Sequence, residues 1–251
     1  MERIVITASA GSFPGLAEAL SAPGRTVAEQ PLIHFTAPSD WTQLDQALDR
    51  LNQYQAVALT SPRGATAFAT RLADRGIRWP LVNAPTVWAG GAGTAAALGG
   101  SVGPVRIPNE REAGPSGAAA ALAQLMLDAR IAGPVLFPCG STRREVLPRR
   151  LESEGVKVDE VVCYQSLMAD ESEARAAAEG STLLIVASPS VAHLLIGACP
   201  PGSRPDMVAV GPTTAAAARD GRWEPAAVAS HPVGDAVVAA VGEVLARRSV
   251  S

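Results

Sequence analysis

Short apolar runs alternate along this chain with longer segments in which apolar residues recur every three or four positions. The short runs are typical of buried strands, and the longer segments are typical of amphipathic helices. We expect strands at 3–7, 31–35, 56–60, 86–90, 134–138, 160–163, 182–187, 206–210 and 226–229. We expect helices at 41–53, 64–75, 116–128, 142–154, 191–197, 213–220 and 234–247. This alternation predicts an α/β fold with parallel sheets, right-handed crossovers and helices on both sheet faces.

Much of the chain is duplicated. Residues 3–33 match residues 134–164 at one constant offset, over a strand, a small-residue turn, a helix and a closing glycine. The offset places Ile33 opposite Tyr164. Two further matches align VALTSPRGATAF with LIVASPSVAHLL, and VWAGGAGTAAAL with VAVGPTTAAAA. Two copies of one series of elements indicate two similar lobes.

The order of the copies predicts how the lobes are connected. We expect the chain to leave the first lobe near residues 31–38 and to return near residues 164–170. The continuous lobe is then 36–167, and the discontinuous lobe combines 1–35 with 168–251. Both crossing segments are short and extended, which suits a two-stranded connector. We expect the active site in the cleft between the lobes.

Composition narrows the class of protein. Hydrophobic residues make up 47% of the chain and aromatic residues only 4%, which suits helices packed on parallel strands. A net charge of −3 without a dense Lys/Arg block argues against nucleic-acid binding. No apolar run approaches the roughly 20 residues of a membrane span, and no signal-peptide pattern is visible. We therefore expect a cytoplasmic protein that binds neither nucleic acid nor membrane.

Two Ser-Pro turns each end a predicted strand and open a predicted helix. Serine suits the N-cap and proline the first helical turn, and the N–H groups there attract carboxylates or phosphates. Ligands of α/β proteins bind at the carboxyl ends of strands. Ser61, Ser188 and Ser190 are therefore candidate binding residues, with helix capping alone as the alternative.

Two glycine-rich turns follow the same logic. They make Thr94, Thr213 and Thr214 candidate binding residues. Residues 91–96 also fit a loose G-x-G-x-x-A dinucleotide pattern. No acidic residue ends the next strand, however, and the duplicated turn lacks the second glycine, so the pattern is weak.

A third strand-to-helix turn, at 138–145, carries two arginines. They are either solvated helix-surface charges or groups that bind a substrate carboxylate.

Tyr164 follows a predicted strand at the point where we expect the chain to cross between the lobes. Its phenol can donate a hydrogen bond or act as a weak acid. The alternative is that Tyr164 only packs in the core. The histidines and cysteines form no catalytic or metal-ligating pattern, so we expect neither metal nor cofactor.

Taken together, these segments resemble the uroporphyrinogen-III synthase family over essentially the whole chain. The ordered set carries the resemblance: LTSPRGATAF, AGGAGTAAAL, FPCGSTRREVLP, LESEGVKVDEVVCYQ, ASPSVAHLL and VAVGPTTAAAA. The family implies two flavodoxin-like lobes joined by a two-stranded hinge. It also implies a cofactor-free reaction that closes hydroxymethylbilane, a linear tetrapyrrole with many carboxylates, to uroporphyrinogen III. Water is lost and the last pyrrole ring is inverted.

The resemblance also implies residue roles. Tyr164 matches the family tyrosine proposed to assist departure of the hydroxyl. Positions that hold the carboxylate arms are matched by Ser61, Thr94, Ser188, Ser190, Thr213 and Thr214. Arg63 and Arg144 match basic positions of some members. One departure is Ala8 after Thr7, where many members have arginine, and this removes a possible carboxylate partner.

Two other readings remain open. One is a non-catalytic two-lobed protein that binds a ligand or acts as a regulator. The other is a nucleotide-dependent transferase that uses the glycine-rich turns. Whichever reading holds, we expect a monomer, because the duplication already supplies internal pseudosymmetry.

Overall fold

The structure is a computed structural model that describes residues 2–79, 81–109, 117–142 and 145–248. Contacts within the chain divide it into two compact units. Unit 1 combines Met1–Phe35 with Leu167–Ser251, and unit 2 is Thr36–Ser166.

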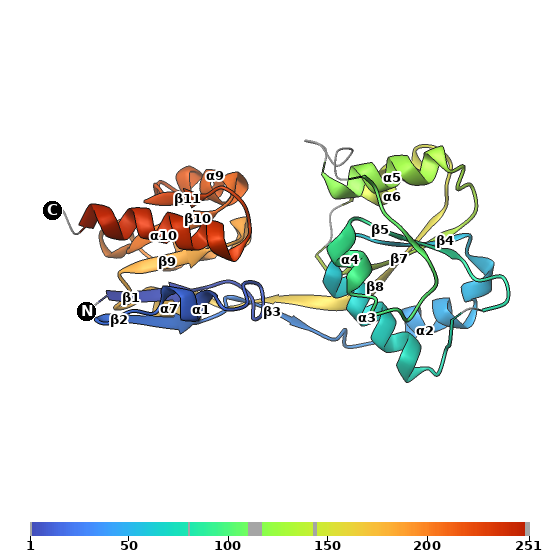
Figure 1. Cartoon of the computed structure of the whole chain (residues 1–251), viewed down its shortest axis with the longest axis horizontal. Helices are drawn as coiled ribbons and strands as arrows, with labels where there is room; N and C mark the ends of the chain where they lie inside the picture. Colours follow the sequence, from blue (N-terminus) through green and yellow to red (C-terminus); the bar gives the residue numbers. More distant parts are fainter. Residues whose placement is uncertain (1, 80, 110–116, 143–144, 249–251) are drawn as a thin grey trace. The chain divides into compact units, whose positions relative to one another are not determined.

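Unit 1 contains a five-stranded parallel sheet in the order β11-β10-β9-β1-β2 (Figure 1). The strands are β1 (Glu2–Ile6), β2 (Arg25–Glu29), β9 (Leu183–Val186), β10 (Asp206–Val210) and β11 (Ala227–Ala229). The helices are α1 (Leu16–Leu20), α7 (Glu171–Ala178), α8 (Pro189–Ala198), α9 (Pro212–Asp220) and α10 (Gly234–Arg248), with a 3₁₀ turn η2 (Pro201–Ser203). Counted within the unit, the strand order is 2-1-3-4-5, the flavodoxin-like arrangement.

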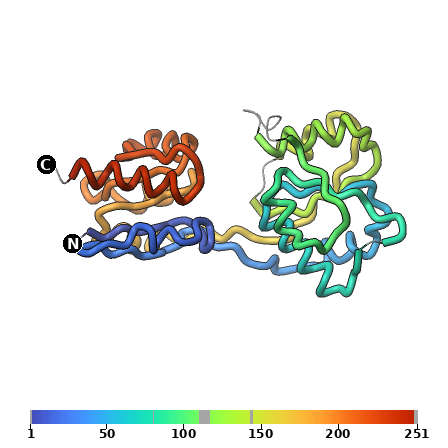
Figure 2. Tube along the Cα trace, in the orientation of Figure 1, coloured from blue at the N-terminus to red at the C-terminus, as the bar shows by residue number. Residues whose placement is uncertain are grey.

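Helices cover both faces of this sheet. Leu16 of α1 and Val237 of α10 belong to the core on one face. Ala174 of α7 and Leu195 of α8 belong to the core on the other. The N-terminal segment lies beside strands and helices from the last third of the chain (Figure 2), so unit 1 is assembled from both ends of the sequence.

Unit 2 contains the order β3-β8-β7-β4-β5-β6, and β4 to β8 pair in parallel. The strands are β3 (Ile33–Thr36), β4 (Ala56–Leu59), β5 (Thr86–Ala89), β6 (Val105–Arg106), β7 (Val135–Gly140) and β8 (Val158–Met168). The helices are α2 (Thr42–Asp49), α3 (Pro62–Asp74), α4 (Ala92–Ala96), α5 (Ala118–Asp128) and α6 (Val146–Glu152), with a 3₁₀ turn η1 (Leu51–Gln53). The unit boundaries fall within β3 and β8, which are neighbouring strands. That these strands act as a hinge stays a prediction.

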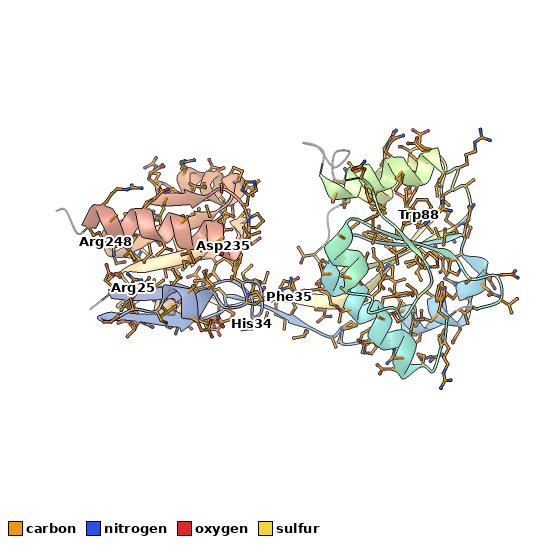
Figure 3. The ribbon with its side chains drawn as sticks, viewed as in Figure 1. Arg25, His34, Phe35, Trp88, Asp235 and Arg248 are labelled. Atoms are coloured by element: carbon orange, nitrogen blue, oxygen red, sulfur yellow. The ribbon has the colours of Figure 1, made fainter. Side chains whose placement is uncertain are left out.

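The sheet of unit 2 is also buried on both faces. Phe68 of α3 belongs to the core on one face, and Leu122 of α5 and Leu147 of α6 belong to the core on the other. Trp88 of β5 is one of the largest fully buried side chains (Figure 3). Its indole N–H donates to the hydroxyl of Thr86 at 2.7 Å, so the buried polar atom is satisfied.

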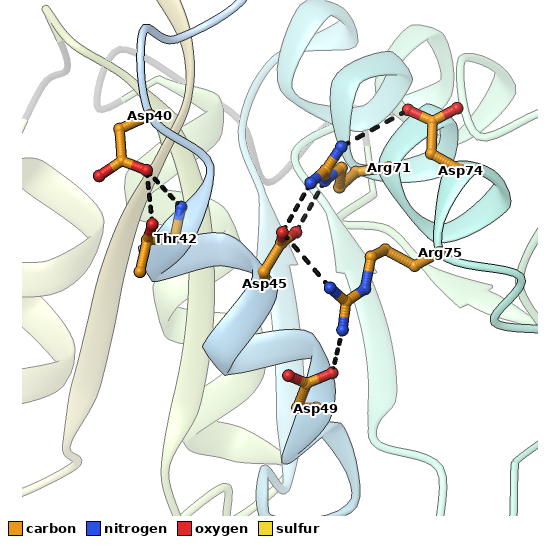
Figure 4. A network of polar contacts seen from close by, with 7 residues as sticks. All are labelled: Asp40, Thr42, Asp45, Asp49, Arg71, Asp74 and Arg75. Atoms are coloured by element: carbon orange, nitrogen blue, oxygen red, sulfur yellow. Dashed lines mark hydrogen bonds and ion pairs between the residues drawn. The ribbon is translucent and has the colours of Figure 1, made fainter.

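Ion pairs join α2 to α3 (Figure 4). The carboxylate of Asp45 accepts two hydrogen bonds from Arg71, at 2.7 and 2.6 Å, and lies 3.4 Å from the guanidinium of Arg75. Arg71 also stacks over the ring of Trp41 at 4.8 Å. A bidentate pair of this kind fixes geometry as well as adding energy. It holds the body of α3, the helix that begins at the site described below.

The duplication seen in the sequence recurs in the strand register. Ile4 pairs with Val27 in one copy, and Val135 pairs with Val158 in the other, and these are aligned positions of the repeat. The closing glycines share a left-handed conformation, with φ 78° at Gly24 and φ 80° at Gly155. Read from β7 through β8 and then β4 to β6, unit 2 also has the order 2-1-3-4-5. It is therefore a circularly permuted version of unit 1.

The predicted fold class is confirmed as α/β with two mainly parallel sheets. Several elements differ from the prediction. The strand Arg25–Glu29 and the helix Glu171–Ala178 were not expected, because the first is short and polar and the second is rich in alanine and glutamate. Strand β8 continues to Met168, well beyond the predicted end at residue 163. Across the part of the chain that is described, no helix is both long and apolar enough to span a membrane.

Candidate functional site

In the sheet of unit 2, the chain adds strands outward from β4 to β6 on one side and from β7 to β8 on the other. The order of the strands therefore reverses between β7 and β4. Open α/β sheets bind ligands outside the carboxyl ends of their strands at such a switch point. Gly140 ends β7 there, and Ser61 follows β4 as the N-cap of α3. Tyr164 reaches the same place from β8, the strand on the other side of β7.

The sequence Thr-Ser-Pro-Arg-Gly forms the start of α3 in the way its residue types predict. Ser61 has an extended backbone, and its hydroxyl accepts a hydrogen bond from the N–H of Gly64 at 3.0 Å. Pro62 occupies the first helical position, where a missing N–H costs nothing. The local sequence therefore both begins the helix and fixes the Ser61 side chain at its tip.

A β-bulge aims Tyr164 at this tip. Cys139 pairs with Val162, but the next residue, Gly140, pairs with Tyr164, so Cys163 is an extra residue on β8. The bulge interrupts the usual alternation of side chains. Cys163 and Tyr164 are consecutive, and yet both pack against the same core beneath α3.

The phenol of Tyr164 lies across the end of β7. A Cβ placed on Gly140 would meet its ring at 2.5 Å. The Tyr164 hydroxyl is 3.3 Å from the hydroxyl of Ser61, and either oxygen can be the donor. Tyr164 is half-buried, so its ring is packed while part of the side chain stays accessible to solvent.

Backbone and thiol contacts support this placement. The N–H of Ser141 donates to the carbonyl of Tyr164 at 3.0 Å, and the Ser141 hydroxyl accepts from the N–H of Ser166 at 3.1 Å. The thiol of Cys163 lies 3.4 Å from the carbonyl of Cys139. Burial, with a smaller effect of Cys139, raises the pKa of Cys163 to about 12. Cys163 is thus a packed, protonated thiol.

Arg63 adds positive charge beside the phenol. It lies in the first turn of α3 with an exposed side chain. Partial desolvation lowers the pKa of its guanidinium, and the interaction with Tyr164 acts in the opposite direction. Arginine stays charged in proteins. The site therefore combines a phenol, a serine hydroxyl and a cation, which can donate a proton and stabilise the resulting anion.

Two other residues of unit 2 were predicted to bind substrate, Thr94 and Arg144. Thr94 is in the first turn of α4, after the neighbouring strand β5, and is buried. Arg144 lies outside the described residues. Within the described ranges, no group of three or more His, Cys, Asp or Glu side chains is arranged to hold a metal ion.

The remaining candidates belong to unit 1. Ser188 is the N-cap of α8 at the carboxyl end of β9, but its side chain makes no capping hydrogen bond. Ser190 and Thr213 are exposed, whereas Thr214 is buried in α9. These residues share the carboxyl edge of two adjacent strands, β9 and β10.

The two copies are not equivalent at this point. The repeat places Ser9 opposite Gly140 and Ile33 opposite Tyr164. A phenol over the switch point is thus a property of unit 2.

The sequence analysis did not identify Gly140 and Ser141 as residues of the site. A signal for Gly140 was present, because it closes the buried run Val-Leu-Phe-Pro-Cys. Glycine within a strand often marks the close approach of another group.

The chain is similar to known proteins in sequence and in fold. The family model described as uroporphyrinogen-III synthase HemD matches residues 15–239. A uroporphyrinogen-III synthase of Synechococcus elongatus is 30% identical over 166 residues. That match covers 65% of this chain and 60% of the relative, so the chain aligns with less than two thirds of that protein.

Solved structures share the fold. A mutant uroporphyrinogen III synthase of Thermus thermophilus matches with a TM-score of 0.64 at 18% identity, over 98% of this chain and 100% of that one. A uroporphyrinogen-III synthetase of Helicobacter pylori matches with a TM-score of 0.55 at 15% identity, over 97% and 100% of the two chains. Because the family model spans most of the sequence, the resemblance is confirmed, and the chain belongs to the uroporphyrinogen-III synthase family.

Proposed function

We propose that the protein converts hydroxymethylbilane to uroporphyrinogen III with loss of water and inversion of the last pyrrole ring. Membership of the family supports this activity. The observation that carries it is the Tyr164 hydroxyl, which lies at the switch point of unit 2 beside Ser61. It is a proton donor in the position where α/β proteins bind ligands.

In the proposed reaction Tyr164 protonates the terminal hydroxyl of the substrate. The carbon–oxygen bond breaks, water leaves, and a phenolate remains beside the positive charge of Arg63. Ring closure at the inverted pyrrole later releases a proton from carbon, which returns the phenolate to a phenol. The balance is the loss of one water. A positioned acid of this kind contributes about 10²–10⁴-fold to the rate.

The substrate carboxylates need donors in fixed positions. We place them on Arg63 and the N-terminal turn of α3 in unit 2, where N–H groups and a cation favour anions. Further candidates are the guanidinium of Arg144 and the hydroxyls and neighbouring backbone amides of Thr94, Ser188, Ser190, Thr213 and Thr214. Holding a flexible polyanion in one conformation is the larger part of the task, because an unguided chain closes without inverting its last ring.

We also propose that the protein acts as a monomer, since the donors named above belong to one chain. We further propose that it uses no cofactor, since the proposed loss of water needs only a proton donor, which Tyr164 supplies. Sedimentation at the enzyme concentrations of the assay tests the first point. A dimer that loses activity on dilution would contradict it.

The test of function supplies hydroxymethylbilane and separates the uroporphyrinogen isomers by chromatography. Type III product, formed in proportion to the amount of protein, is the expected result. Type I product alone, at the rate of a protein-free control, would contradict the proposal and leave a ligand-binding protein as the interpretation. The Tyr164→Phe variant run in parallel shows whether the phenol takes part.

A further inference from the structure

We propose that Gly140 is a positioning residue for Tyr164, because its missing side chain is the space in which the phenol lies. This inference rests on the proposed role of Tyr164 as proton donor. It concerns how unit 2 brings that donor to Ser61, across the intervening strand β7.

The contact involves the outer end of the ring. A Cβ on Gly140 would lie 2.5 Å from Cζ, 2.6 Å from Cε2 and 2.8 Å from the hydroxyl oxygen of Tyr164. Real Cβ atoms essentially never approach heavy atoms within 3.0 Å. A tyrosine ring is rigid, so these three atoms cannot move aside independently. Any side chain at this position must displace the ring as a whole.

The backbone gives no other reason for glycine here. Gly140 ends a buried, extended strand and is absent from the glycines with left-handed φ. An alanine could adopt its conformation without strain. Glycine within a strand is itself unfavourable, since it gains nothing from packing and loses more entropy on folding. The approach of Tyr164 is therefore the feature that requires glycine at this strand end.

The duplication offers an internal comparison. At the aligned position of unit 1 the chain has Ser9, and at the position of Tyr164 it has Ile33. The copy without the phenol carries a side chain where unit 2 has none. The glycine and the tyrosine thus occur together in one copy and are both absent from the other.

The functional consequence follows from distance. The phenol lies between Gly140 and Ser61, on the strand whose register shifts at the Cys163 bulge. Displacement of a reacting group by about 1 Å can cost on the order of 10²-fold in rate. We therefore expect Gly140→Ala to lower kcat about 100-fold. The KM should stay within about twofold, because the carboxylate-binding donors are untouched.

The first test measures stability and needs no substrate. Thermal midpoints are compared for the wild type, Gly140→Ala, Tyr164→Ala and the double variant. Overpacking should lower the midpoint of Gly140→Ala by about 5 °C. The same substitution should cost little in the Tyr164→Ala background, where the ring is gone. If Gly140→Ala fails to fold and the double variant folds, the steric coupling is supported. An equal cost in both backgrounds, or loss of folding in both, would overturn the inference.

The second test measures kcat and KM with hydroxymethylbilane. Gly140→Ala should have little further effect in the Tyr164→Phe background, because the proton donor is already missing. Gly90→Ala is the matched control, since this glycine follows the nearby strand β5 and its Cβ would meet no atom closer than 3.6 Å. The control should retain wild-type kcat. Full activity of Gly140→Ala would also overturn the positioning role.

The two tests separate the two proposals. If Tyr164→Phe is fully active while the stability cycle shows coupling, the proposed acid is wrong and the steric relationship stands. If Tyr164→Phe is inactive while the cycle shows no coupling, the acid is supported and Gly140 is not what positions it.

Discussion

The hydroxyl of Tyr164 lies 3.3 Å from the hydroxyl of Ser61, although 103 positions separate the two residues in the chain. One comes from β8 and the other from the turn after β4, and β7 lies between these strands in the sheet. The phenol spans the intervening strand because that strand ends in Gly140. The pair therefore joins a proton donor to the tip of α3.

Removing the phenol hydroxyl should reduce activity without unfolding the protein. We expect Tyr164→Phe to lower kcat by roughly two to four orders of magnitude, because a positioned acid is lost. Steady-state kinetics and circular dichroism measure the two effects. Tyr54→Phe is the matched control, since Tyr54 is the other tyrosine and its hydroxyl donates to Asp159 at 2.8 Å. The control should lose about 1 kcal/mol of stability and keep its activity.

Ser61→Ala should affect both the helix and the phenol. Its hydroxyl accepts from the N–H of Gly64 and contacts Tyr164, so we expect a loss of about 1 kcal/mol of stability together with a lower kcat. Ser188→Ala, at the aligned position, removes no side-chain capping bond. Chemical denaturation should show a change of less than about 0.5 kcal/mol for Ser188→Ala. Equal losses in the two variants would contradict the capping geometry.

The ion pairs between α2 and α3 should make stability depend on acid pH. Hydrogen bonds from Arg71 lower the pKa of Asp45 below its usual value. The folded pKa is then below the unfolded pKa of about 3.9. The stabilisation is present above that unfolded value and is lost as pH falls through the folded pKa.

Asp45→Asn should accordingly destabilise the protein at pH 7, and the difference from wild type should shrink below about pH 4. Denaturant midpoints measured across this range provide the test. Asp49→Asn is the control. Asp49 is more exposed than Asp45, and within the network of Figure 4 it forms an ion pair with Arg75 only. Its effect should be smaller. A difference for Asp45→Asn that grows in acid would contradict the assignment.

Cys163 should resist thiol reagents in the native protein. With its pKa raised to about 12, only about 10⁻⁴ of the thiol is ionised at pH 8, and the side chain is fully buried. Mass spectrometry after iodoacetamide treatment should find Cys163 unmodified until denaturant is added. Rapid native labelling would mean that β8 separates readily from β7, and would weaken the case for a fixed Tyr164.

Much of the fold could be predicted because its signals are local. Short apolar runs, helical periodicity and Ser-Pro turns depend on neighbouring residues. The Ser-Pro turns do open α3 and α8, although both helices begin two residues before the predicted starts at 64 and 191. The duplication could also be recognised from the sequence, because aligned positions carry similar residue types. In the structure the aligned positions share a register, β1 with β2 and β7 with β8, although the strand Arg25–Glu29 was not itself expected.

The candidate site was only partly predictable. Tyr164 and Ser61 were identified separately, one at a strand end and one at a helix start. Their contact was not, because it depends on strand order and on the extra residue Cys163 in β8. A bulge changes which face a side chain occupies, and it arises from pairing between strands rather than from a local pattern.

The sequence by itself determined the α/β class, the two copies and the family, since each is written in periodicity, repetition and ordered motifs along the chain. Only the tertiary structure decided that the copies differ by circular permutation and that Gly140 lies beneath Tyr164. The physical reason is that parallel neighbours in a sheet are distant in sequence. The strand register determines which side chains meet across neighbouring strands. At this site it acts together with the space that the missing Cβ of Gly140 leaves.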